Sequence, residues 1–214
     1  MDISHRKVKK KIQVKGPDGK ALANTKIRIK QTNHEFLFGC GAFDFIPYAC
    51  KDIIPEEMKK NFDEAMLNDA VEKWLSVFNY GTIPFYWGAY EPTEGNPQKE
   101  SRMKAAEYLN SKNVTVKGHP LCWHTVCADW LMKYDNKTIM QKQLDRIERE
   151  VVGFKGVVDM WDVINEAVIM PVYDRYDNAI TRICKELGRV KLIKEVFDAA
   201  HAANPEATLL INDF

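Results

Sequence analysis

The sequence predicts an α/β fold in which a parallel β-sheet is covered by helices. Short apolar segments rich in β-branched residues alternate along the chain with segments whose apolar residues recur at helical spacing. These apolar segments carry few charges, which is typical of strands buried on both faces of a parallel sheet. Such an alternation occurs in doubly wound sheets and in eightfold barrels, and it does not by itself separate the two.

Length and composition exclude several classes of protein. The chain has 214 residues, which is enough to bury a core without metals or disulfides. A net charge of +1 without a basic stripe disfavours a nucleic-acid partner. No stretch approaches the roughly 18 apolar residues that a membrane span needs, so no membrane partner is expected.

The amino terminus and the cysteines bear on localisation. The first residues are basic but lack the apolar core of a signal peptide. The five cysteines cannot all pair within one chain, so we expect reduced thiols. The expected location is therefore cytoplasmic, or secreted if the sequence is a domain from a longer secreted protein.

Residues 1–35 are predicted to form a short β-hairpin, either a lead-in or an edge element. Apolar and polar residues alternate in part over residues 8–14 and strictly over residues 26–30. Between them, residues 16–19 have the sequence Gly-Pro-Asp-Gly, which predicts a turn. The apolar run 36–43 that follows predicts a strand buried on both faces.

The middle of the chain predicts two helices and two strands. A helix opens at Pro55, and its apolar stripe is supplied by Met58, Phe62, Met66 and later Trp74 and Phe78. The other three elements are a strand over 78–83, a helix over 100–113 and a strand over 114–119.

The last third predicts three helices and two strands. Asn136 is a candidate cap for a helix that continues to Val151. Gly188 ends a helix over 179–187, and Asn204-Pro205 ends the next one. The two strands cover 157–164 and 208–213.

The spacing of the strands fixes how much of a barrel the chain would hold. Four repeats between mid-strand positions near 39 and 211 give about 43 residues each, which is long for an average eightfold barrel. Eight such repeats would pass about 300 residues. If the fold is a barrel, residues 36–214 therefore hold about its first five strands.

The segment 161–167, Trp-Asp-Val-Ile-Asn-Glu-Ala, carries the strongest chemical signal. In parallel α/β folds, catalytic groups lie at the carboxyl ends of strands, and Glu166 is placed there. Its apolar neighbours would raise its pKa, which is how a glutamate becomes a general acid. A strand-end glutamate can also merely cap a turn, but Asn165 beside it and Asp162 upstream favour a functional site.

The segment 118–124, Gly-His-Pro-Leu-Cys-Trp-His, offers a second group. If the strand continues through it, His119, Leu121 and Trp123 share one face, so His119 and Trp123 line the same mouth as Glu166. A lone histidine beside apolar residues is often a core residue, whereas an indole at a polar crevice is suited to stacking on a sugar.

A zinc site is the alternative interpretation of this segment. His119, Cys122, His124 and Cys127 are all possible ligands. Their spacing is not that of a zinc knuckle, and strand geometry would send them to opposite faces. We therefore expect no metal and no other cofactor, and we interpret Cys122 and Cys127 as packing thiols.

Residues 84–90, Pro-Phe-Tyr-Trp-Gly-Ala-Tyr, are unusually aromatic for a segment that follows a strand. Such a cluster belongs either to a satellite core or to a platform for sugar stacking, and Tyr86 and Trp87 are the candidates for the platform. No phosphate-binding loop, serine elbow or dinucleotide fingerprint is present, so kinases, α/β-hydrolases and nicotinamide enzymes find no support.

In several of its segments the sequence resembles glycoside hydrolase family 10, the endo-β-1,4-xylanase family. The resemblance runs from about Phe36 to the last residue, and its most specific part is Trp161 to Ala167. The matching blocks are 36–39, 118–124 with 129–131, 161–167 and 211–214.

The resemblance implies an eightfold β/α barrel that hydrolyses xylan with retention of configuration. It implies that Glu166 is the acid/base and that Asn165 binds the sugar 2-hydroxyl. His119 and Trp123 would line that sugar's subsite, and Asp162 would orient its neighbours. Of the other matched residues, Asn212 is expected at the substrate and His124 behind it.

The resemblance also defines what the chain lacks. The nucleophile of the family lies on strand seven, outside the sequence, so the 214 residues alone should lack steady turnover. The remainder of the barrel is then the expected partner, beside xylan or a related β-1,4-linked polysaccharide. The family's Glu-Asn pair and lysine after strand two are absent, as is a glutamine near Val126. The alternative is a noncatalytic carbohydrate-binding barrel fragment.

Overall fold

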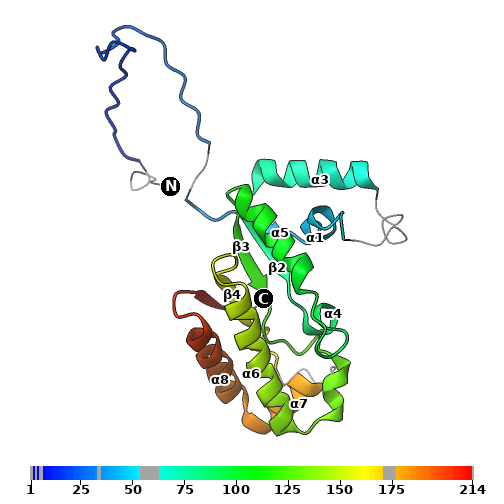
Figure 1. Ribbon diagram of the computed structural model, residues 1–214. Helices are drawn as coiled ribbons and strands as arrows, with labels where there is room; N and C mark the ends of the chain where they lie inside the picture. Colours follow the sequence, from blue (N-terminus) through cyan, green and yellow to red (C-terminus); the bar gives the residue numbers. More distant parts are fainter. Residues whose placement is uncertain are drawn as a thin grey trace. The chain divides into compact units, whose positions relative to one another are not determined.

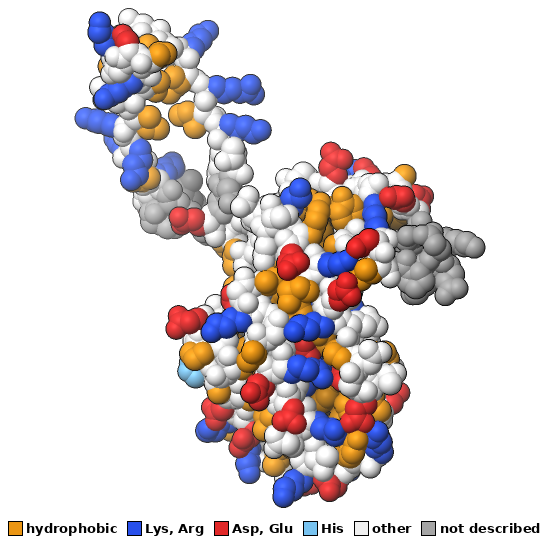
Figure 2. Space-filling view, viewed as in Figure 1, with side chains coloured by type: hydrophobic (Ala, Val, Ile, Leu, Met, Phe, Trp, Pro, Cys, Tyr) orange, Lys and Arg blue, Asp and Glu red, His pale blue; other side chains and the backbone are white. Residues whose placement is uncertain are grey.

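A computed structural model of the chain describes residues 2, 4, 7–32, 35–53, 63–170 and 177–213. The chain divides into two compact units, Met1–His34 and Glu35–Phe214. Figure 2 shows mainly basic side chains on the first unit and interspersed acids and bases on the visible face of the second.

The first unit forms the predicted turn but little of the predicted strands. Lys15 and Ala21 make one antiparallel bridge, and the amide of Gly16 donates to the carbonyl of Lys20 at 2.8 Å. The alternating residues Ile27 and Ile29 are 52% and 77% exposed. A two-stranded ribbon is marginal without a third strand or a packing surface, so only the tip of the hairpin is present in the described residues 7–32.

The second unit is built on five parallel strands in the order β1-β2-β3-β4-β5. Each strand therefore pairs with the next strand along the chain. A doubly wound sheet reverses its strand order at a switch point, whereas a barrel adds its strands in sequence. The topology confirms the first five strands of a barrel. Their bounds are β1 Gly39–Gly41, β2 Tyr80–Pro84, β3 Thr115–His119, β4 Met160–Asn165 and β5 Thr208–Asn212.

Helices connect these strands and pack on the sheet. Helix α5 contacts β2 and β3, α8 contacts β4 and β5, and α6 packs against α7 and α8 (Figure 1). The helices are α1 Phe45–Ala49, α3 Glu64–Val77, α4 Trp87–Tyr90, α5 Lys99–Ser111, the 3-10 helix η2 Asp129–Lys133, α6 Asn136–Gly153, α7 Ala179–Leu187 and α8 Arg189–Ala203. None of the helices within the described ranges is long and apolar enough to cross a membrane.

Several helix ends can be compared with the sequence. The predicted end of α7 is confirmed, because Gly188 follows it with a φ of 83°. The predicted cap of α6 is wrong by one residue: the carboxylate of Asp135 accepts from the amide of Thr138 at 2.7 Å, whereas Asn136 is already helical.

The predicted helix from Pro55 can be judged only in part. Pro55, Met58 and Phe62 lie outside the described residues. Within α3, Met66 is 71% exposed and not part of the core, whereas Trp74, also predicted on the apolar face, packs against the core, as does Val71.

The predicted burial of the first strand is also wrong. All three residues of β1 are exposed, as are Phe36 and Phe38 before it. The pattern correctly identifies these residues as apolar, but among the residues that the structure describes β1 pairs with one strand only, β2, which leaves its other side exposed. By contrast, five of the six residues of the interior strand β4 are buried.

An aromatic cluster forms the centre of the core. The ring of Phe85 lies 4.9 Å from that of Trp161 and 5.0 Å from that of Phe154, measured between centroids. Gly118 on β3 makes room for this cluster, because a Cβ at that position would lie 2.2 Å from Cζ3 of Trp161. The glycine is therefore required by the close approach of the indole to the backbone.

Candidate active site

The polar side chains of interest lie at one edge of the sheet. Parallel strands end at a common edge, so the residues that follow β2, β3, β4 and β5 meet there. Glu166 follows β4, and its carboxylate Oε2 accepts a hydrogen bond from the indole nitrogen of Trp123 at 2.8 Å. Two segments separated by more than 40 residues are thus joined at this edge.

The backbone of Glu166 is unusual. Its φ is 54°, in the left-handed region that non-glycine residues rarely adopt. The conformation is held by its amide, which donates to the carbonyl of Asn212 on β5 at 2.8 Å. Left-handed backbone at a non-glycine residue costs on the order of 1–3 kcal/mol and is concentrated at functional sites.

Asn165, the last residue of β4, is fixed by two neighbours. Its Oδ1 accepts from Nδ2 of Asn212 at 2.7 Å, and its amide donates to the carbonyl of Cys122 at 3.0 Å. The side chain is 3% exposed. Asn212 therefore supports Asn165. Because the side-chain oxygen of Asn165 accepts this hydrogen bond, its NH₂ group is left to donate to other partners.

His119 ends β3 and is anchored from behind. Its Nδ1 lies 2.7 Å from Oδ2 of Asp162, and the ammonium of Lys117 lies 2.7 Å from the same oxygen. Asp162 is 1% exposed. The sequence analysis missed Lys117, although Lys117 and His119 are two residues apart on one strand and so share a face.

Tyr86 places an aromatic ring beside this group. Its ring stands edge-on to that of His119 at 5.6 Å and lies 5.4 Å from that of Trp123. Burial, followed by the charge of Glu166, raises the pKa of the Tyr86 phenol above its ordinary value. Phe43, which follows β1, meets Tyr86 edge-on at 6.0 Å. We call Phe43, Tyr86 and Trp123 the aromatic wall.

Trp87 does not face the site, contrary to the prediction of a substrate contact. Its indole is 5% exposed, and its nitrogen donates to Oε2 of Glu91 at 3.1 Å. Helix α4 begins at Trp87, and the indole packs edge-on against Trp130 at 5.8 Å. Of the aromatic residues after β2, only Tyr86 lies against His119 and Trp123, and the others contribute to the core.

Two residues of the segment after β3 are buried. Leu121 is fully buried and does not line the mouth with His119 and Trp123. Its amide donates to the carbonyl of Asp162 on β4 at 2.9 Å, and its carbonyl accepts from the side chain of Gln143 on α6 at 3.0 Å. His124 is buried too, with its ring edge-on to Trp123 at 6.5 Å. Burial lowers the pKa of the His124 imidazole, and the charge of Glu166 opposes this.

A buried arginine ties the ends of β2 and β3 together. Arg146 on α6 is 3% exposed, and its guanidinium donates to the carbonyls of Phe85 and Leu121. Phe85 directly follows β2 and precedes Tyr86, and Leu121 lies between the end of β3 and Trp123. This contact could not be predicted, because a charged residue such as Arg146 on a helix is normally expected at the surface.

The thiols near the site are enclosed. Burial raises the pKa of Cys122 far above its ordinary value and raises that of Cys127 to about 11. Within the described ranges, no three His, Cys, Asp or Glu side chains are grouped so that they could hold a metal ion.

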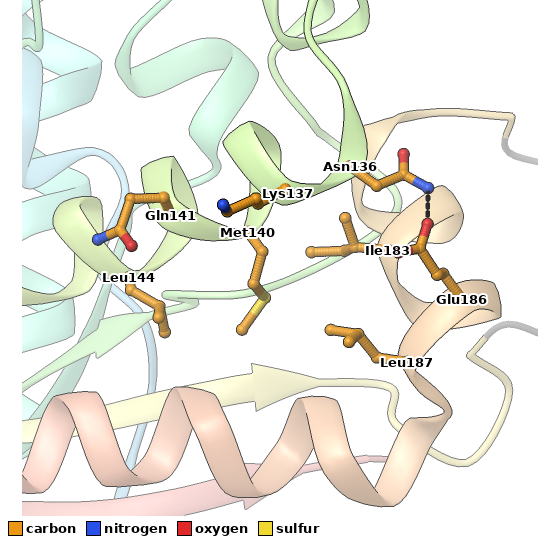
Figure 3. A pocket seen from close by; sticks show the side chains of 8 residues that line it. All are labelled: Asn136, Lys137, Met140, Gln141, Leu144, Ile183, Glu186 and Leu187. Atoms are coloured by element: carbon orange, nitrogen blue, oxygen red, sulfur yellow. Dashed lines mark hydrogen bonds between the residues drawn. The ribbon is translucent and has the colours of Figure 1, made fainter.

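A cavity of about 270 Å³ lies elsewhere, between α6 and α7. Figure 3 shows Met140 and Leu144 of α6 opposite Ile183 and Leu187 of α7, with Asn136 hydrogen-bonded to Glu186 at one end. None of the residues that line this cavity belongs to the strand-end group, so the cavity is not the candidate site.

The fold and the site define a class of protein before any comparison. The strands follow one another in sequence in a parallel sheet, and a carboxylate, an amide, an imidazole and an indole meet at their carboxyl ends, which is where (β/α)-barrel enzymes carry their active sites. The family model "Glycosyl hydrolase family 10" matches residues 82–214, and the chain belongs to this family.

Individual proteins that are similar to this chain include several xylanases. Endo-1,4-beta-xylanase C of Paenibacillus barcinonensis is 28% identical over 141 residues, which cover 59% of this chain and 13% of that protein. Endo-1,4-beta-xylanase A of Thermotoga maritima is 31% identical over 121 residues, which cover 54% of this chain and 11% of that protein. The crystal structure of native xylanase 10B from Thermotoga maritima matches with 26% identity and a TM-score of 0.60, covering 71% of this chain and 46% of that one. The chain thus spans less than half of each of these relatives.

Proposed function

We propose that the protein is a retaining endo-β-1,4-glycosidase of the xylanase type, with Glu166 as its general acid/base. Membership of glycosyl hydrolase family 10 and the names of the relatives support the class of reaction and substrate. The observation that carries the assignment of Glu166 is its position at the end of β4, with left-handed backbone and with the Trp123 indole on its carboxylate.

The hydrogen bond from Trp123 determines how Glu166 would work. Because the indole donates to Oε2, the acidic proton is carried by Oε1. Oε1 then protonates the departing glycosidic oxygen in the first step and accepts a proton from water in the second. The half-buried position of Glu166 limits the competing access of bulk water.

The neighbouring groups suit a sugar ring. The NH₂ group of Asn165 donates to a sugar hydroxyl, because its oxygen is bound to Asn212. Asp162 holds Nδ1 of His119 and leaves Nε2 for a hydroxyl. The faces of Tyr86 and Trp123 pack on the apolar C–H surface of the ring.

Retaining hydrolysis needs a second carboxylate about 5–5.5 Å from the first, as the nucleophile. We place it outside the 214 residues, on polypeptide that completes the barrel. This placement follows from the resemblance, and it fits a chain that spans less than half of the matched xylanases. Xylan or a related β-1,4-linked polysaccharide is the substrate, and the rest of the barrel is the partner of this segment.

The test uses the protein from the complete open reading frame, with product analysis on xylan and on other β-1,4-linked polysaccharides. Replacing Glu166 by glutamine should lower kcat by about 10²–10⁴-fold, while binding of xylo-oligosaccharides persists. Glu148→Gln, an exposed change on α6, is the matched control and should leave kcat unchanged. Full activity of Glu166→Gln would refute the role of Glu166. Xylan binding without any hydrolysis by the wild type would instead favour a carbohydrate-binding protein.

A further inference from the structure

Phe43 is an exposed aromatic residue at the rim of the site. It lies two residues after β1, at the same edge of the sheet as Tyr86, and it is 43% exposed. The residues around it, Ala42 and Phe45, are each 1% exposed. Phe43 thus lies between two buried residues and points outward, as its immediate neighbour Asp44 also does.

The backbone that carries Phe43 is anchored on both sides. The amide of Ala42 donates to the carbonyl of Thr82 on β2 at 2.8 Å, which continues the pairing of β1 with β2. The carbonyl of Phe43 accepts from the amide of Ile46 at 3.1 Å in the first turn of α1. The ring is thus presented from a fixed backbone, which reduces the entropy lost when a ligand binds.

The aromatic wall connects Phe43 to the proposed acid/base. Trp123 donates to Glu166, Tyr86 lies 5.4 Å from Trp123, and Phe43 stands edge-on to Tyr86 at 6.0 Å with an interplanar angle of 81°. The wall thus follows the ends of β3, β2 and β1, and its Trp123 end contacts Glu166 at the end of β4. Because the two ring planes are nearly perpendicular, Tyr86 contacts at most one face of the Phe43 ring.

We propose that Phe43 is a sugar-contact residue. Its exposed face stacks on a neutral pyranose ring of a β-1,4-linked chain, next to the ring that Tyr86 contacts and on the side away from Glu166. Stacking fits here because the apolar C–H face of a pyranose matches an exposed aromatic face. The inference rests on the proposed function and extends the binding site to the end of β1.

The proposal predicts an effect that depends on substrate length. In the protein from the complete open reading frame, Phe43→Ala should lower kcat/KM about tenfold for long xylo-oligosaccharides. It should leave kcat/KM unchanged for the shortest one that is hydrolysed, because that substrate does not reach Phe43. Phe43→Trp should restore the values for the long substrates, because stacking needs an aromatic face.

Phe36→Ala is the matched control. Phe36 is 75% exposed and precedes β1 at the opposite edge of the sheet, so its loss should change neither set of values. Binding measured in the Glu166→Gln background, together with thermal melting of each variant, separates contact with the substrate from misfolding.

The outcomes distinguish this inference from the proposed function. If the wild type hydrolyses xylo-oligosaccharides and Phe43→Ala has no effect, or an equal effect at all lengths, the role of Phe43 is overturned and the proposed function stands. If the wild type neither binds nor hydrolyses any of them, both fail.

Discussion

The buried ion pair behind His119 offers the most direct test of how the site is held. Lys117 and Asp162 lie on adjacent strands, with Nζ 2.7 Å from Oδ2 and with side chains only 13% and 1% exposed. Replacing Lys117 by methionine keeps the length of the side chain and removes its charge. The Asp162 carboxylate then stays buried with His119 as its remaining partner.

The expected loss of stability is large. Two unit charges 2.7 Å apart attract each other by about 6 kcal/mol at an effective dielectric constant of 20, and desolvation of both groups offsets part of this. Removing one partner of a buried pair typically costs about 3–5 kcal/mol, because the other charge is left uncompensated. We therefore expect Lys117→Met and Asp162→Asn each to lower the free energy of unfolding by about 3–5 kcal/mol.

Urea denaturation of the single and double variants measures this coupling. Because the double variant leaves no buried charge unpaired, its loss should be at least about 1 kcal/mol smaller than the sum of the two single losses. Lys73→Met is the control, since Lys73 and Asp69 are 2.6 Å apart but exposed, and it should match the wild type. Additive losses, or single losses below about 1 kcal/mol, would refute the reasoning.

Two further changes probe the core and its response to acid. Gly118→Ala places a methyl group against the fully buried Trp161 and should cost about 1–3 kcal/mol or more, seen as a lower Tm; an unchanged Tm would contradict the packing described. At Glu91, burial acts to raise the pKa, but hydrogen bonds, above all from Arg149, outweigh it and hold the pKa below its ordinary value of 4.5. The carboxylate therefore stabilises the fold above pH 4.5, and this contribution is lost as the pH falls through the lowered pKa. Glu91→Gln should be less stable at neutral pH, with a flatter decline of the urea midpoint in acid, and a decline as steep as that of the wild type would disprove the assignment.

The locations of the strands along the chain and the position of Glu166 at the end of one of them could be predicted from the sequence. Apolar runs bounded by glycine, proline and asparagine locate strands well, and in a parallel sheet every strand end points to the same edge. For this reason His119, Trp123, Asn165 and Glu166 could be placed together without coordinates.

Other features depend on information that a local pattern does not carry. The contact of Lys117 with Asp162 depends on the register of β3 against β4, and the exposure of β1 depends on which strands flank it. Tyr86 and Trp87 are adjacent, and the start of α4 decides which of them faces the site. The cap of α6 differs from the prediction by one residue, which is within the usual uncertainty of helix ends.

The left-handed backbone at Glu166, the proposed acid/base, costs folding free energy at the residue whose carboxyl group the proposed reaction needs. A glycine there would adopt the same φ without steric cost, so the most relaxed sequence at this site is one without a carboxyl group. Variants selected only for thermal stability would tend to lose the proposed acid/base, whereas selection for the proposed activity would keep the strained residue. The hydrogen bond to Asn212 from the neighbouring strand is what makes that compromise tolerable.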